Sequence, residues 1–136
     1  MSEEESFQPE NLASELLTSL TRLTNEAKAF SPIECLGQAR AHAKQAEALS
    51  ANNPLINMKL VQALMDSFEQ VVRDFENLPN HSKAWLKGAI LYFTRTEDGE
   101  HDFESVLGFE DDCEVVNACL ELAGRDDLKV DPEDYD

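Results

Sequence analysis

The chain has 136 residues, with 28 Asp and Glu against 11 Lys and Arg, so its formal net charge is −17. A content of 42% hydrophobic residues is enough for the core of one domain, which excludes a globally disordered chain. The charge is uneven: residues 1–96 carry a net −3, whereas residues 97–136 carry −14, with 16 acidic residues against two basic ones. This surplus repels phosphates and therefore disfavours direct binding of nucleic acid.

The sequence predicts a cytoplasmic chain with no membrane span. Its beginning, MSEEESFQPEN, has neither the basic region nor the apolar run of a signal peptide. No apolar stretch approaches the roughly 20 residues that a transmembrane helix needs. The three cysteines, Cys35, Cys113 and Cys119, lack a C-x-x-C spacing, and we expect them to be reduced and buried. Residues 1–8 are acidic and are predicted to be disordered.

Two helices are expected in the first 50 residues. Leucines at three- and four-residue steps predict a helix from Pro9 to about Phe30, with the proline in its first turn. A second helix follows Ser31, because Ser31-Pro32-Ile33-Glu34 has the form of a capping box with proline at the first helical position. The inner face of this helix is mostly alanine, which allows a neighbouring helix to approach closely.

Three further helices are expected over about 54–77, 81–95 and the stretch that ends at Gly124. The first of them has apolar residues at helical steps on more than one face around residues 56–72, so either core burial or a homo-oligomer interface could explain it. Gly124 is a favourable residue just past a helix end. Residues 125–136 are too polar to bury themselves and are predicted to be a disordered acidic tail.

The elements together predict an all-α fold, a compact bundle of about five helices with a short acidic C-terminal tail. Residues 9–124 form the single helical domain. No alternation typical of strands and no Asn-Gly hairpin turn is found in the sequence.

The most acidic stretch, residues 97–112, has eight acidic residues and no Lys or Arg. Three features offset the repulsion: Asp98-Gly99 is a turn dipeptide, Asp102 can cap a short turn, and residues 110–112 fall in the first turn of the last helix, where the helix dipole favours anions. Phe103 and Phe109 are apolar side chains within the same run. We therefore expect a loop in which most acids have fixed places.

The stretch LKGAILYFTRTEDGEHDFESVLGFEDD, residues 86–112, resembles the YkvA-like family of small helical bacterial domains. In that family, an apolar helix ending in an aromatic residue leads into a loop of the form Pro-x-Asp-x-x-Pro-Asp-Phe-x-Pro-x-x-Gly-x-x-Asp-Asp. Thr96, His101 and Ser105 stand where the family has proline. The resemblance covers residues 84–123 and implies a helical fold, without an established activity. The matching positions are Asp98, Asp102, Phe103, Gly108, Asp111 and Asp112.

No metal, cofactor or catalytic motif is recognised. Asp98, Asp102, Asp111, Asp112 and His101 are close in sequence, but an EF-hand counted from Asp98 would need glycine and glutamate where the chain has Phe103 and Phe109. Helix capping on a solvated acidic face is therefore the favoured interpretation of these acids. Cys35 and His42 share a helix face but have no accompanying oxyanion loop. We expect a chain that is not an enzyme and has no cofactor.

The sequence therefore favours an acidic adaptor or regulatory module that binds another protein, one with a basic surface. The alternative is a nucleic-acid mimic, such as an immunity or anti-defence protein that blocks a basic groove of a nucleic-acid enzyme. A mimic is expected to spread ordered carboxylates over one face, whereas six of the 16 C-terminal acids fall in the tail. The predicted partner-binding residues are Asp98, Glu100, Asp102, Phe103, Glu104, Phe109, Glu110 and Asp111.

Overall fold

The structure is a computed structural model that describes residues 8–10, 12–54, 56–94 and 110–135. Within these ranges the chain forms helices and no strand, which confirms the all-α class. None of the described helices is both long enough and apolar enough to cross a membrane. The elements are α1 (Ser14–Ala27), α2 (Pro32–Ser50), α3 (Met58–Arg73), η2 (Phe75–Asn77), α4 (Asn80–Thr94), α5 (Glu110–Leu122), η4 (Asp126–Leu128) and η5 (Pro132–Tyr135).

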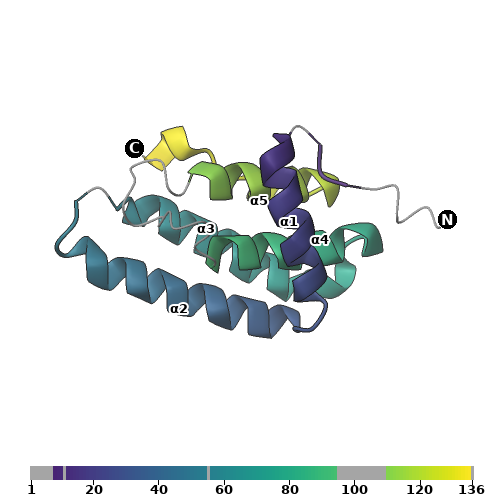
Figure 1. Cartoon of the computed structure of the whole chain (residues 1–136), viewed down its shortest axis with the longest axis horizontal. Helices are drawn as coiled ribbons and strands as arrows, with labels where there is room; N and C mark the ends of the chain where they lie inside the picture. The colour runs from purple at the N-terminus through teal and green to yellow at the C-terminus, as the bar shows by residue number, and fades with distance from the viewer. Residues whose placement is uncertain (1–7, 11, 55, 95–109, 136) are drawn as a thin grey trace.

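Helix α4 lies at the centre of the bundle, where it packs against α1, α2 and α5. Helix α3 packs against α2, and α1 crosses α4 (Figure 1). Figure 1 also shows α2 along one edge of the molecule and α5 with the C-terminal segment along the opposite edge. The residues from Gly88 to Leu91 in α4 are all buried, as expected for a helix covered by neighbours on several sides.

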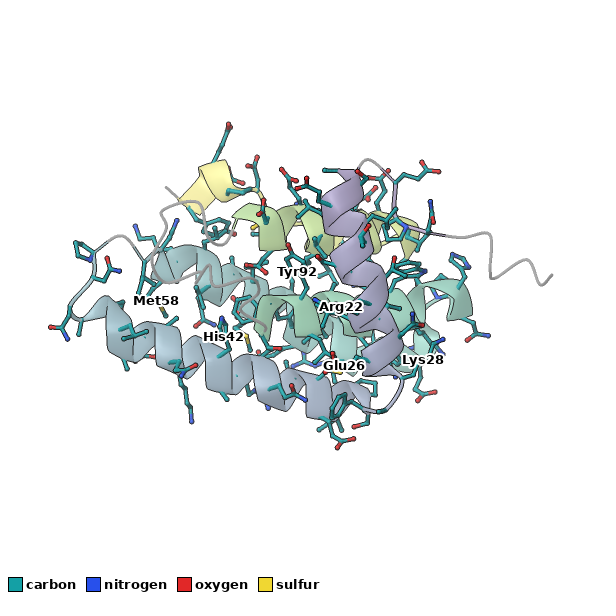
Figure 2. The ribbon with its side chains drawn as sticks, viewed as in Figure 1. Arg22, Glu26, Lys28, His42, Met58 and Tyr92 are labelled. Atoms are coloured by element: carbon teal, nitrogen blue, oxygen red, sulfur yellow. The ribbon has the colours of Figure 1, made fainter. Side chains whose placement is uncertain are left out.

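The centre of the core is aromatic. Phe68 of α3 and Phe93 of α4 meet edge to face, with ring centroids 5.4 Å apart. His42 of α2 meets the same Phe93 ring at 5.0 Å, also edge to face. Figure 2 shows His42 pointing from α2 into the bundle. The three rings therefore connect α2, α3 and α4.

The start of α2 confirms the predicted capping box. The Ser31 hydroxyl accepts a hydrogen bond from the Glu34 N–H at 3.1 Å, and the Glu34 carboxylate accepts one from the Ser31 N–H at 2.9 Å. Pro32 occupies the first helical position, where a missing N–H costs nothing. Local sequence alone therefore determines where α2 begins.

The predicted starts of the first and third helices are wrong. Helix α1 begins at Ser14 rather than at Pro9, which is buried in a segment before the helix. Helix α3 begins at Met58 rather than near residue 54, because Asn57 caps it by accepting a hydrogen bond from the Leu60 N–H at 3.1 Å. The disorder predicted for residues 1–8 concerns residues that, except for exposed Gln8, lie outside the described ranges.

The broad apolar surface of α3 is core. Leu60, Val61, Leu64, Met65 and Phe68 are each at most 6% exposed. Among the described residues, the exposed large apolar side chains are Ile33 and Leu49, both on α2. Burial inside the chain thus explains the apolar pattern of α3, and no homo-oligomer interface is needed to explain it.

The disorder predicted for the acidic tail is wrong for residues 125–135. These residues fold back onto α3 and α5 and include two short 3-10 helices, η4 and η5. Val130 is 3% exposed and belongs to the same buried cluster as the core. The segment is polar in composition, but its main-chain hydrogen bonds are made with distant side chains, which local sequence does not reveal.

The turn that starts this segment is the one expected at Gly124. Its φ is +73°, in the left-handed region that favours glycine. The Arg125 N–H donates to the Leu120 carbonyl at 2.8 Å and the Gly124 N–H donates to the Glu121 carbonyl at 3.1 Å. This pair of bonds is a Schellman motif, which ends α5 and redirects the chain toward α3.

Candidate functional site

The predicted partner-binding loop lies almost entirely outside the described residues. Only two of its members are within them, Glu110 as the first residue of α5 and Asp111 as an exposed residue in the first turn. Their placement agrees with acids at a helix N-terminus, where the peptide dipoles favour negative charge. The members outside the described ranges are Asp98, Glu100, Asp102, Phe103, Glu104 and Phe109.

Asp112, the third acid of this turn, is not part of a solvated face. It is 1% exposed, against the expectation that these acids face solvent. The sequence held a signal for this burial, because Asp112, Val115, Val116 and Cys119 follow the spacing of one helix face, and the last three are core residues.

The described acidic charge is concentrated on one part of the molecule. Residues 12–54 hold four acidic and four basic residues, and residues 56–94 also hold four of each. Residues 110–135 hold ten acidic and two basic residues, a formal net charge of −8. Because α5, η4 and η5 lie along one edge and α2 along the other, this charge is one-sided (Figure 1). We call the exposed acids of α5 and residues 126–135 the acidic face.

The two cations of this part of the chain are held by its own acids. Arg125 binds Asp127 through two hydrogen bonds, each 3.0 Å, and Asp74 through one of 3.0 Å. The hydrogen bonds that Arg125 donates to Asp127 and Asp74 raise the pKa of its guanidinium. Lys129 donates to Glu121 at 3.0 Å and lies 3.3 Å from Asp126; the hydrogen bond to Glu121 raises its pKa.

Several acids of the face have no such partner. Glu114, Glu133 and Asp134 are exposed and form no ion pair with any described lysine or arginine. Asn117 lies one turn after Glu114 on α5, and its side chain forms two hydrogen bonds with the main chain of Val130. These bonds fix the position of Val130 next to α5, and Asp131 is the next residue in the chain. The arrangement therefore presents carboxylates from α5 and from the C-terminal segment on one folded surface.

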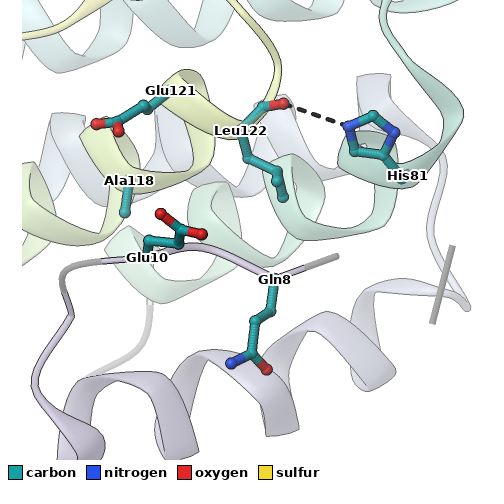
Figure 3. A pocket seen from close by; sticks show the side chains of 6 residues that line it. All are labelled: Gln8, Glu10, His81, Ala118, Glu121 and Leu122. Carbon is teal, nitrogen blue, oxygen red and sulfur yellow. Dashed lines mark hydrogen bonds between the residues drawn. The ribbon is translucent and has the colours of Figure 1, made fainter. Parts of the chain in front are cut away.

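A pocket of about 260 Å³ lies at the C-terminal end of α5. Figure 3 shows its lining, which comes from the N-terminal segment, the start of α4 and the last turns of α5. The His81 ring Nε2 lies 3.4 Å from the Leu122 carbonyl oxygen. Two carboxylates, Glu10 and Glu121, also line the pocket, so it adds negative charge at this end of the helix.

The thiols are placed for packing rather than for chemistry. Cys35, Cys113 and Cys119 are all buried, as predicted, and none forms a disulfide. Burial raises the pKa of the Cys119 thiol far above its usual range, so it stays protonated and a poor nucleophile. Cys35 and His42 do share the inner face of α2, and both are buried there. No group of three metal-ligating side chains is found among the described residues.

Comparisons with protein-family models, with curated proteins and with solved structures found no match for this chain. The resemblance of residues 84–123 to the YkvA-like family stays a prediction. The acidic face and its ordered C-terminal segment are thus the features of the described structure that bear on function.

Proposed function

We propose that this chain is a non-enzymatic adaptor or regulatory module of the cytoplasm, related to the YkvA-like domains, that binds a protein partner through its acidic face. The observation that carries the proposal is the one-sided charge: ten acids and two cations in residues 110–135, with both cations paired to acids of the same chain. A surface of this kind attracts a basic partner.

The mechanism is electrostatic steering followed by charge pairing. The field of an acidic surface accelerates encounter with a basic one and orients it before contact. Screening shortens this range to about 8 Å at physiological ionic strength, so the association rate falls as salt is added. The predicted loop residues come directly before α5 in the sequence. We include them in the proposed interface, with Phe103 and Phe109 as apolar anchors beside the acids.

One specific observation favours the alternative function, nucleic-acid mimicry. A mimic needs carboxylates in fixed positions, and five of the six tail acids are in the described part of residues 125–136, which is folded onto α3 and α5. The partner in that case is a nucleic-acid enzyme whose basic groove receives the acidic face. Competition with duplex DNA separates this alternative from a general adaptor.

The proposal is tested with two charge-matched variants of the full chain. Glu114→Gln, Glu133→Gln and Asp134→Asn together remove three charges from the acidic face. Glu15→Gln, Glu47→Gln and Glu76→Gln remove three exposed charges elsewhere. We expect immobilised wild type and the second variant to capture a basic partner from cell extract at about 0.05 M salt and to release it at about 0.5 M. The first variant should lose most of that capture.

Equal capture by both variants contradicts binding through the acidic face. Replacing Asp102, Glu104, Glu110 and Asp111 by their amides tests the loop in the same assay, and should weaken capture and flatten its salt dependence. Release of the captured partner by duplex DNA supports mimicry, whereas retention in its presence supports the adaptor function.

A further inference from the structure

The C-terminal segment is held by α5 through its main chain. The Asn117 side chain bonds Val130 in both directions: its Nδ2 donates to the Val130 carbonyl and its Oδ1 accepts from the Val130 N–H, each at 2.8 Å. A side-chain amide thus pairs with the peptide group of one residue in the way a neighbouring strand does. This pairing does not depend on which side chain the held residue carries.

Two side chains at α3 hold the same segment. The Ser67 hydroxyl donates to the Leu128 carbonyl at 2.7 Å. The Asn57 Nδ2 donates to the Tyr135 carbonyl at 2.9 Å, while the Oδ1 of the same side chain caps α3. All these bonds again reach main-chain atoms. Asn57, Ser67 and Asn117 therefore form a docking surface for the main chain of this segment.

One side chain of the segment is fully buried in the docking surface. Val130 is 3% exposed, and the chain just before it is extended, with φ −60° and ψ 146° at Lys129. Leu128, Pro132 and Tyr135 are only half-buried, and the acids of the segment are exposed. Besides this single buried anchor and a few hydrogen bonds, ion pairs of Asp127 with Arg125 and of Lys129 with Glu121 attach the segment at the surface. Surface ion pairs add little stability, so this is a weak attachment for ten ordered residues, typical of segments that open without global unfolding.

The docking surface is built into the core elements. Ser67 is only 7% exposed on the inner face of α3 and Asn117 is half-buried on α5. Because these side chains belong to helices of the bundle, the core positions their donor and acceptor atoms, not the segment that they hold.

We propose that residues 126–135 are a releasable strap, and that the docking surface of Asn57, Ser67 and Asn117 accepts a peptide from another chain when the strap leaves. The sequence and conformation of the strap indicate the chemistry of that peptide. It has short 3-10 turns on both sides of an extended residue, a β-branched apolar residue at the place of Val130, acidic residues around it and no other fully buried side chain. The main-chain hydrogen bonds supply affinity and the valine site supplies selectivity.

This inference goes beyond the proposed function and does not rest on it. The strap carries Asp126, Asp127, Asp131, Glu133 and Asp134, half of the ten acids in residues 110–135. Its release moves these charges away from their fixed positions. A peptide that takes its place therefore also changes the acidic face.

The test uses the full chain and a fluorescein-labelled peptide with the sequence of residues 126–135. Val130→Asp places a charge in the buried site and should release the strap. We expect fluorescence anisotropy to show that this variant binds the peptide at least about tenfold more tightly than wild type, in which the attached strap competes at high effective concentration. Leu49→Asp, which adds the same charge at an exposed apolar residue of α2, should bind no better than wild type.

Two further measurements keep the test decisive. Adding Asn117→Leu to the Val130→Asp variant should abolish peptide binding, and a peptide with aspartate in place of the valine should not bind. A Val130→Asp variant that keeps its helical circular dichroism but binds no peptide overturns the proposal. If that variant does not fold, hydrogen exchange of wild type decides: the Val130 amide should exchange at least about tenfold faster than the amides of α4. Equal exchange rates overturn it.

Discussion

At the residue scale, Gly88 shows what the closest helix contact of the bundle requires. A Cβ at this position would clash with the Thr24 hydroxyl and lie 2.8 Å from the Thr24 Cα, which is a backbone atom and cannot rotate away. Gly37 on α2 is the opposite case, because a Cβ there meets nothing within 4 Å. Both glycines are inside helices, yet only one is explained by packing.

Alanine at these two glycines is therefore expected to act in opposite directions. Gly88→Ala should lower the free energy of unfolding by roughly 1–3 kcal/mol, because α1 and α4 must move apart. Gly37→Ala should raise it by about 0.5–1 kcal/mol through the better helix propensity of alanine. Urea unfolding of both variants measures the difference. A stabilised Gly88→Ala variant would mean that α1 and α4 are not packed this closely.

At the element scale, Arg125 fastens the strap to the end of α3. It binds Asp74, which follows α3, and Asp127 in η4. Hydrogen bonds from Gln70 and then Arg125 lower the pKa of the Asp74 carboxyl, and the hydrogen bond from Arg125 lowers that of Asp127. A carboxyl with a lowered folded-state pKa stabilises the fold above its ordinary value of 3.8 and loses that contribution as the pH falls through the lowered value.

We therefore expect Arg125→Gln to lower the melting temperature at pH 7 and to lower it less and less as the pH falls below about 4, where both carboxyls become protonated. Melting curves of wild type and variant across that range measure the difference. Lys44→Gln, at an exposed cation of α2, is the control and should show no such convergence. A constant gap between wild type and Arg125→Gln would indicate that these pairs do not stabilise the fold.

The elements that sequence predicted well are those with local signals. The capping box at Ser31 and the glycine at 124 fixed two helix ends within one residue, because the deciding hydrogen bonds join residues at most five apart. The start of α1 was missed because buried Pro9 belongs to the segment before the helix. The strap was missed because Asn57, Ser67 and Asn117 are up to 78 residues from what they hold.

The candidate site was predicted only in its general character. The acidic surplus of the last 40 residues is evident in the sequence, and the part of it in residues 110–135 does belong to one side of the described structure. The distribution of those acids between buried and exposed positions is not evident, as Asp112 shows. Loop residues from Asp98 to Phe109 stay a prediction, since they lie outside the described ranges.

At the scale of the whole molecule, the distribution of charge lowers the stability of the fold. Residues 12–54 and residues 56–94 each balance their charges, whereas α5 and the strap concentrate acids whose mutual repulsion opposes their packing. Each pair of such acids about 7 Å apart costs roughly 0.6 kcal/mol in water and less in salt. Removing such acids is therefore expected to stabilise the fold.

The variant Glu114→Gln, Glu133→Gln and Asp134→Asn is therefore expected to melt about 2 °C higher than wild type at low salt, and at nearly the same temperature in about 0.5 M salt. The variant Glu15→Gln, Glu47→Gln and Glu76→Gln should change less, because its charges lie in balanced surroundings. Calorimetric scans at both salt concentrations measure the shifts. Equal shifts in the two variants would show that the repulsion is a property of the net charge and not of the acidic face.

The way the strap is held also determines how freely its sequence can vary. Its main-chain attachments reach the carbonyls of Leu128, Val130 and Tyr135 and the N–H of Val130, and only the valine is fully buried. Among its side chains, Asp127 and Lys129 also form ion pairs, with Arg125 and Glu121. The fold thus constrains one position strongly and leaves most of the acids open to substitution by other polar residues. Mutation could neutralise these acids one by one without unfolding the chain. Such substitutions would change the charge of the surface while leaving the buried position at Val130 intact.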